Sequence, residues 1–175
     1  MSIKDSIRTI PDFPKEGVMF RDLTTLFADP SAFAESVELI AAFCRSKDID
    51  YIAGIESRGF IVGSAVALKL GKGFIPIRKN GKLPGAVISR TYQLEYGEDT
   101  IQIHDDVISP GKSVLIVDDL LATGGTALAS AELIESAGGI VAGLAFIVNL
   151  PDLKGDERLK KRSYEIFHIC SFEGD

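Results

Sequence analysis

Beyond residue 28, the chain alternates between two spacings of its apolar residues. Between Pro30 and Ser46 they recur at helical spacing, which predicts a helix that Asp29 is suited to cap. Two further helices are predicted at Gly59–Leu70 and Gly125–Ala137, each followed by glycine. Short apolar runs predict the strands, which are Tyr51–Ile55, Gly73–Ile77, Val114–Val117, Ile140–Asn149 and Tyr164–Ser171.

This alternation predicts an α/β fold, with a central mostly parallel sheet, helices on both faces, and Tyr164–Ser171 at an edge. Ligands in such folds bind beyond the carboxyl ends of the strands. Val87–Tyr96 and Thr100–His104 predict an antiparallel hairpin that turns at Gly97-Glu98-Asp99. Residues 1–28 lack a clear period, and we interpret them as an arm that packs over the main domain.

The composition narrows the class of protein. A chain of 175 residues, 46% of them hydrophobic, fits one globular domain. Its net charge of −6 argues against a nucleic-acid partner. The N-terminus has no signal-peptide core and the longest apolar run, Ile140–Val148, is too short to cross a bilayer, so we expect a soluble, cytoplasmic protein that needs no membrane. Cys44, Cys170, His104 and His168 are isolated in the sequence, which argues against a zinc site.

The segment Val114–Thr126, VLIVDDLLATGGT, suits a phosphorylated ribose. Its apolar strand is followed at once by Asp118 and Asp119, and adjacent carboxylates beside a core repel each other and resist desolvation. They therefore require hydroxyl donors, a metal ion or a nearby cation. The glycines of Ala122–Thr126 allow a tight turn whose N–H groups, threonine hydroxyls and helix N-terminus suit a phosphate monoester. A ribose diol would then lie beside the two aspartates.

The order of apolar strand, two acids and ATGGT closely resembles the phosphoribosyl-diphosphate (PRPP) motif of type I phosphoribosyltransferases. Four other segments resemble segments of the adenine phosphoribosyltransferases within that family, and they occur in the same order along the chain. They are Phe13–Asp22, Glu56–Phe60, Arg78–Gly85 and Leu94–Gly97. The resemblance implies a type I phosphoribosyltransferase fold in a single domain over residues 1–175. It also implies that residues 1–28 form an N-terminal arm over the base site and that residues 87–104 form a flexible hairpin lid.

The resemblance assigns the parts of PRPP to particular residues. It implies that Asp118 and Asp119 bind the ribose hydroxyls and act in catalysis. It implies that the 5′-phosphate is held by Ala122, Thr123, Gly124, Gly125 and Thr126. Arg58, Lys79 and Lys82 would contact the diphosphate, to which an arginine can donate two bonds. From the residues alone, Arg58 could also be a surface arginine, and the two lysines a solvated run of charge.

The acceptor implied by the resemblance is adenine, and the implied reaction gives AMP and diphosphate as a step of purine salvage. Phe20 would stack on the base, groups near Met19 and Arg21 would read its edge, and Leu153 would cover its opposite face. For Phe20 the alternative is packing in the core.

Three further expectations concern the lid, the metal and the assembly. Glu95 lies near the hairpin turn, and if closure of the lid buries it, its pKa rises and it can donate a hydrogen bond or proton to N7 of the base. Mg²⁺, held mainly by PRPP and with no protein ligand assigned, would offset the charge of the leaving diphosphate. The resemblance implies a homodimer, although Ile61, Val62 and Val66 suit an interface and core packing equally well.

Three rival functions share parts of this pattern. The same chemistry on hypoxanthine, guanine, xanthine or orotate is opposed by the FPKEGVMFRD arm. A PRPP-binding transcriptional regulator would need a DNA-binding module, and this acidic chain has no spare helix-turn-helix. A subunit that makes PRPP would need an ATP site and a longer chain than 175 residues.

Overall fold

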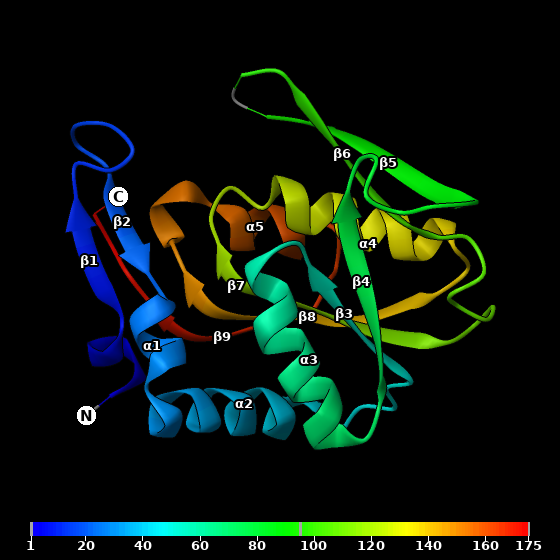
Figure 1. Cartoon of the computed structure of the whole chain (residues 1–175), viewed down its shortest axis with the longest axis horizontal. Coiled ribbons are helices and arrows are strands. Elements are labelled where there is room, and N and C mark those ends of the chain that lie inside the picture. The colour runs from blue at the N-terminus through cyan, green and yellow to red at the C-terminus, as the bar shows by residue number, and fades with distance from the viewer. Residues whose placement is uncertain (1, 95, 175) are drawn as a thin grey trace.

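A computed structural model describes residues 2–94 and 96–174 of the chain. Its centre is a seven-stranded sheet in the order β5-β6-β4-β3-β7-β8-β9 (Figure 1). The five strands from β4 to β9 are mutually parallel, whereas β6 pairs antiparallel with both β4 and β5. The predicted α/β fold, with its mostly parallel sheet and antiparallel hairpin, is confirmed.

The bounds of the elements follow the apolar pattern closely. The strands of the large sheet are β3 (Tyr51–Ile55), β4 (Gly73–Lys79), β5 (Val87–Gln93), β6 (Glu98–His104), β7 (Ser113–Leu121), β8 (Ile140–Asn149) and β9 (Ile166–Ser171). The helices that cover it are α2 (Pro30–Cys44), α3 (Arg58–Leu70), α4 (Gly125–Ser136) and α5 (Gly155–Lys160). Asp29 caps α2 by accepting bonds from the N–H groups of Ser31 and Ala32, as its sequence position predicts.

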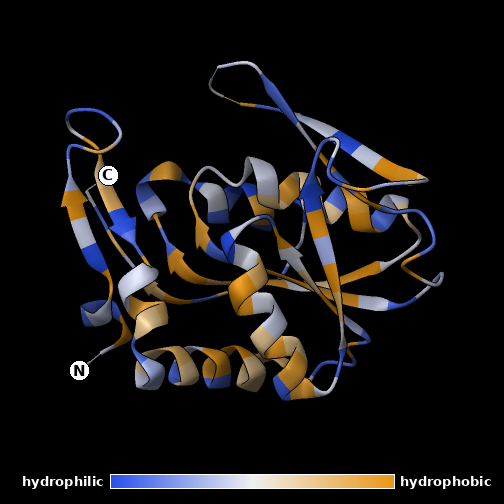
Figure 2. Cartoon of the chain, viewed as in Figure 1, coloured by the Kyte–Doolittle hydropathy of each residue, from blue (hydrophilic) through white to orange (hydrophobic). Residues whose placement is uncertain are grey.

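Two apolar clusters lie on opposite faces of the sheet. One cluster packs α2 and α3, through residues such as Ile40 and Val66, against one face. The other packs α4, through residues such as Leu133, against the opposite face. Figure 2 shows the apolar colours concentrated along the inner strands of the sheet. Because the strands are packed on both faces, the positions of their carboxyl ends and of the loops that follow them are set by the core.

Two of the predicted boundaries that differ from the structure lie near the predicted site, and the pairing of the strands explains both. The strand predicted to end at Val117 continues to Leu121, because β8 pairs with it as far as Leu121 opposite Asn149. The two aspartates therefore lie within β7 rather than after it. The hairpin turn predicted at Gly97–Asp99 lies earlier, because Glu98 and Asp99 already pair with β5.

The N-terminal segment has more regular structure than its sequence indicates. It contains a 3₁₀ helix (Ile3–Ser6), a two-stranded ribbon of β1 (Arg8–Pro11) and β2 (Met19–Asp22), and the short helix α1 (Thr24–Ala28). These elements are too short for a period to be visible in the sequence. The helix α5 was missed for the same reason.

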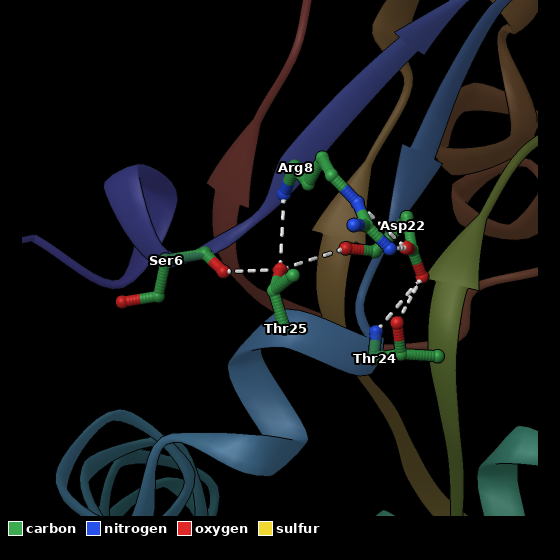
Figure 3. Close-up of polar contacts among 5 residues, drawn as sticks. All are labelled: Ser6, Arg8, Asp22, Thr24 and Thr25. Carbon is green, nitrogen blue, oxygen red and sulfur yellow. Dashed lines mark hydrogen bonds and ion pairs between the residues drawn. The ribbon is translucent and has the colours of Figure 1, made fainter.

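Asp22 and Thr25 fasten this ribbon to α1 (Figure 3). The Asp22 carboxylate accepts bonds from the Arg8 guanidinium and from the Thr24 N–H and hydroxyl, the last at 2.7 Å. The Thr25 hydroxyl donates to the carbonyl of Ser6 at 2.7 Å and accepts from the N–H of Arg8. Asp22 is 7% exposed, so this network lies at the base of the ribbon that carries residues 19–21.

Within residues 2–94 and 96–174, no helix is both long enough and apolar enough to pass through a membrane.

Replacing Asp22 with Asn should destabilise the protein in a pH-dependent way. The bond from the Thr24 hydroxyl, followed by that from Arg8, lowers the pKa of Asp22 to about 2. Its ionised form therefore stabilises the fold fully above the unfolded-state pKa, and this contribution is lost as the pH falls toward 2. Urea unfolding should give a loss of about 1–3 kcal/mol at neutral pH.

The same loss should be clearly smaller at about pH 3, where part of the wild-type contribution has already gone. An equal difference between wild type and variant at both pH values would contradict the role of the ionised carboxylate.

Candidate active site

The polar residues of the predicted site follow three neighbouring strands. Glu56, Ser57 and Arg58 come directly after β3, Lys79 ends β4, and the two aspartates lie near the end of β7. Because β3 is parallel to both β4 and β7, these strand ends meet at one edge of the sheet. Glu56, Ser57, Arg58, Lys79, Asp118 and Asp119 line one shared cavity there.

The adjacent carboxylates have different surroundings. Asp119 is 2% exposed and is paired with Arg58, whose Nε donates to its Oδ2. The Asp118 Oδ1 accepts from the Asp119 N–H at 2.9 Å. Burial raises the pKa of Asp118 well above its ordinary value, and the charge of Asp119 raises it further. Of the three kinds of partner that the sequence left open, the structure places a cation, Arg58, beside Asp119, while Asp118 holds its proton more tightly.

Gly59 allows this arrangement by letting the start of α3 approach β7. A Cβ atom at Gly59 would lie 2.8 Å from the carbonyl oxygen of Val117 and 2.9 Å from the Oδ1 of Asp118. Any side chain here would push α3 away and withdraw Arg58 from Asp119.

The loop after β7 forms the second part of the site. Gly124 has φ +78°, a conformation that favours glycine, and it precedes the first residue of α4. The residues from Ala122 to Thr126 line a cavity together with Glu56, Lys79 and Asp118. Since the N–H groups of the first turn of a helix have no partner within the helix, this cavity suits an anion.

The cationic residues expected at the diphosphate differ in position. Lys79 lines both the cavity of the acid pair and that of the loop. Glu56 fixes its backbone by accepting from the Lys79 N–H at 2.8 Å, and Glu56 also pairs with Arg78. This bond to Lys79 is the main reason that the pKa of Glu56 is lowered, and the charge of Lys82 adds to it. Lys82 itself is exposed in the turn after β4 and lines none of these cavities.

A third, largely apolar cavity of about 270 Å³ adjoins the cavity of the acid pair at Arg58. It brings together the four residues predicted to bind the base, Met19, Phe20, Arg21 and Leu153. Phe20 packs edge-on against Phe13 at 5.1 Å between ring centres. The guanidinium of Arg21 lies over the ring of Phe172 near the C-terminus, 4.5 Å from its centre.

Two lining residues of this cavity, Leu120 and Leu150, were missed by the sequence reasoning. Each lies at the end of a core strand, and its apolar character alone does not distinguish it from its buried neighbours. Glu95, the predicted proton donor, lies outside the described residues.

Comparison with known proteins places this geometry in a family. Residues 23–172 match the model of the phosphoribosyl transferase domain. An adenine phosphoribosyltransferase of Cereibacter sphaeroides is 56% identical over 173 residues, which make up 99% of this chain and 97% of the relative. The chain belongs to the adenine phosphoribosyltransferase family.

Solved structures of adenine phosphoribosyltransferases share the whole fold. The crystal structure from Thermoanaerobacter pseudethanolicus has a TM-score of 0.93 at 48% identity, and the match covers 97% of this chain and 98% of that one. The structure from Saccharomyces cerevisiae, which contains adenine and an imino-altritol bisphosphate, has a TM-score of 0.90 at 38% identity over 95% and 96% of the two chains. The family and the type I phosphoribosyltransferase fold predicted from the sequence are both confirmed.

In this adenine phosphoribosyltransferase fold, Gly155 packs against the back of the loop Ala122–Thr126, which is predicted to bind an anion. A Cβ atom at Gly155, the first residue of α5, would lie 2.3 Å from the carbonyl oxygen of Ala122 and 2.9 Å from the nitrogen of Gly124. The loop therefore keeps its shape because α5 presents bare backbone to it. The sequence carries no signal for this contact, which joins segments about thirty residues apart.

Replacing Gly155 with Ala should displace the loop and weaken its grip on a phosphate. Because an error of about 1 Å in a binding group can cost up to about a hundredfold, we expect kcat/KM for PRPP to fall by about tenfold to a hundredfold. The matched control is Gly73→Ala, where the new Cβ would meet the ring of Tyr51 at 3.0 Å, far from the site.

Steady-state kinetics would measure the effect, and calorimetry with ribose 5-phosphate would isolate the loop. A folded Gly155→Ala protein with wild-type affinity for ribose 5-phosphate would show that this contact does not set the geometry of the loop.

Proposed function

We propose that the three adjoining cavities divide the substrates of the family reaction among them. That reaction transfers the 5-phosphoribosyl group of PRPP to adenine, giving AMP and diphosphate in purine salvage. The observation that carries the proposal is the junction at Arg58, which lines both the apolar cavity and the cavity of the acid pair. A base in the first cavity would therefore lie next to a ribose in the second.

PRPP would bind along the edge of the sheet. Ala122, Thr123, Gly124, Gly125 and Thr126 would hold the 5′-phosphate, and Asp118 and Asp119 the ribose hydroxyls. Arg58, Lys79 and, after a movement of its exposed turn, Lys82 would contact the diphosphate. Breaking the bond at C1 of the ribose builds positive charge on the sugar, which the two carboxylates favour electrostatically.

Adenine would occupy the apolar cavity. Phe20 would stack on the base, Leu153 would cover its other face, and backbone groups near Met19 and Arg21 would read its edge. The ligands of related structures support this choice of acceptor, since the yeast structure contains adenine and the structure from Giardia lamblia contains 9-deazaadenine.

Mg²⁺ would accompany PRPP. Among the described residues, 2–94 and 96–174, no group of three or more His, Cys, Asp and Glu is arranged to hold a metal ion. Mg²⁺ would be held mainly by the oxygens of PRPP, with no protein ligand assigned, and the neighbouring carboxylates of Asp118 and Asp119 are of the type that Mg²⁺ prefers. When bound, Mg²⁺ would offset the negative charge that develops on the leaving diphosphate.

The single domain, the arm and the lid complete the proposal. Residues 1–28 would act as an arm over the base site, and residues 87–104 as a lid that excludes water which would otherwise hydrolyse PRPP. Support comes from β2, which lines the apolar cavity, and from the pairing of Arg90 on the hairpin with Glu132 of α4 at 2.6 Å.

The homodimer and the cytoplasmic location stay predictions. Of the three apolar residues considered for an interface, Val62 and Val66 are 0% exposed and pack in the core. Ile61 is 42% exposed, and Leu68 on the same helix is 85% exposed, so an interface on α3 would use these two residues.

The acceptor can be tested directly. The protein is incubated with PRPP and Mg²⁺, and adenine, hypoxanthine, guanine or orotate is added separately while the release of diphosphate is measured. We expect release with adenine. Activity with hypoxanthine but not adenine would overturn the assignment. An Asp118→Asn, Asp119→Asn protein purified in the same way controls for contaminating enzymes.

Replacing Glu95 with Gln should lower kcat. The carboxyl group would donate a hydrogen bond or proton to N7 of adenine, and an amide can donate a hydrogen bond but not a proton to be transferred. The measurement is kcat with adenine at saturating PRPP. An unchanged kcat would exclude proton donation by Glu95.

A further inference from the structure

A chain of polar contacts connects the anion-binding loop to Lys79 through the hairpin. The Thr126 hydroxyl donates to the phenol oxygen of Tyr92 at 3.0 Å, and the Tyr92 hydroxyl donates to the Oδ2 of Asp99 at 3.3 Å. The same Oδ2 accepts from the Lys79 ammonium group. Two groups proposed to bind opposite ends of PRPP are therefore both engaged by residues of β5 and β6.

Asp99 is held firmly in this position. Its Oδ1 accepts from the N–H of Thr100 at 2.8 Å, so the carboxylate is oriented by its own strand. The bond from Lys79 is the largest cause of the lowered pKa of Asp99. Burial lowers the pKa of Lys79, but the bonds and charge of Asp99 and Tyr92 outweigh burial and raise it. Both partners therefore carry their charges at neutral pH.

The pair lies where a diphosphate would compete for it. Lys79 lines the cavities of both the acid pair and the loop, and its side chain is 40% exposed, so an anion can reach the ammonium group. A fixed carboxylate beside the same ammonium would repel an incoming diphosphate. The ligand must therefore share or displace a partner that is already in place.

We infer that Asp99 is a positioning residue that acts through Lys79, as the resident counter-ion that a diphosphate group displaces. The inference rests on the proposed contact between Lys79 and the diphosphate. Asp99 weakens the binding of PRPP and diphosphate, and it eases the release of product by taking Lys79 back. Displacement also removes one bond between the hairpin and β4, which frees the hairpin to move when the substrate binds.

The test compares Asp99→Asn with wild type by calorimetry with diphosphate and, separately, with ribose 5-phosphate. Diphosphate should bind about twofold to fivefold more tightly to the variant, the factor that corresponds to a partly exposed ion pair. Affinity for ribose 5-phosphate should change less than affinity for diphosphate, because a 5′-phosphate would be held mainly by the residues Ala122–Thr126, although Lys79 also lines their cavity. A purely structural role for Asp99 would not produce this selectivity.

The matched control is Glu98→Gln. Glu98 is the neighbouring residue on β6 and bonds to Gln93 at 3.3 Å, so the change removes the same charge without touching Lys79. If Glu98→Gln increased the affinity for diphosphate as much as Asp99→Asn does, the effect would come from the overall charge of the protein, and the inference would be overturned. Weaker binding of diphosphate by the Asp99→Asn variant would also overturn the inference, because Asp99 would then hold Lys79 in the position that binds the ligand.

A second variant separates this inference from the proposed function. Lys79→Gln should weaken diphosphate binding, and Asp99→Asn should have no further effect in that background. If Lys79→Gln binds diphosphate like wild type, the proposed role of Lys79 fails and the inference fails with it. If Lys79→Gln weakens binding but Asp99→Asn leaves the wild-type affinity unchanged, the inference alone is overturned.

Discussion

Two adjacent carboxylates near the end of the buried strand β7 impose the central constraint on this structure. Asp118 and Asp119 cannot both ionise beside an apolar core without a cation. Arg58 is that cation, and it reaches Asp119 because β3 lies directly beside β7 in the sheet. The approach of α3 in turn requires a residue without a side chain at Gly59. The order of the strands, the position where α3 begins and the glycine at position 59 together bring Arg58 close enough to neutralise Asp119.

The charged residues around the site are paired with one another. Arg58 is paired with Asp119, Arg78 with Glu56, and Lys79 with Asp99. In the proposed binding mode, a strongly anionic substrate would exchange these partners rather than meet unpaired cations. The net gain on binding is the difference between two sets of ion pairs, which is much smaller than either set. Such a site can hold a highly charged substrate and still release a highly charged product.

The sequence predicts those parts of the structure that depend on neighbouring residues. The apolar run before Asp118, the glycines of the loop and the helix after them lie in one short segment, so their arrangement follows from local physics. The cap at Asp29 and the bounds of β3 follow for the same reason. Contacts between distant segments leave no such pattern. Nothing near Gly155 indicates that it will meet Ala122, and nothing near Asp99 indicates that it will meet Lys79.

The arm illustrates why the cavity proposed for the base is harder to predict from the sequence than the cavities proposed for PRPP. The residues around the acid pair and the loop belong to β3, β4, β7 and α4, which the core holds in place. The apolar cavity instead joins residues of β2, the end of β7 and the segment after β8.

Its shape therefore depends on how Asp22 and Phe172 hold the ribbon. Arg58 lies where the two halves meet, since it lines both cavities while it is bonded to Asp119. Any change that moves this guanidinium alters both cavities at once. If the base and the ribose bind as proposed, Arg58 would couple the position of one to that of the other.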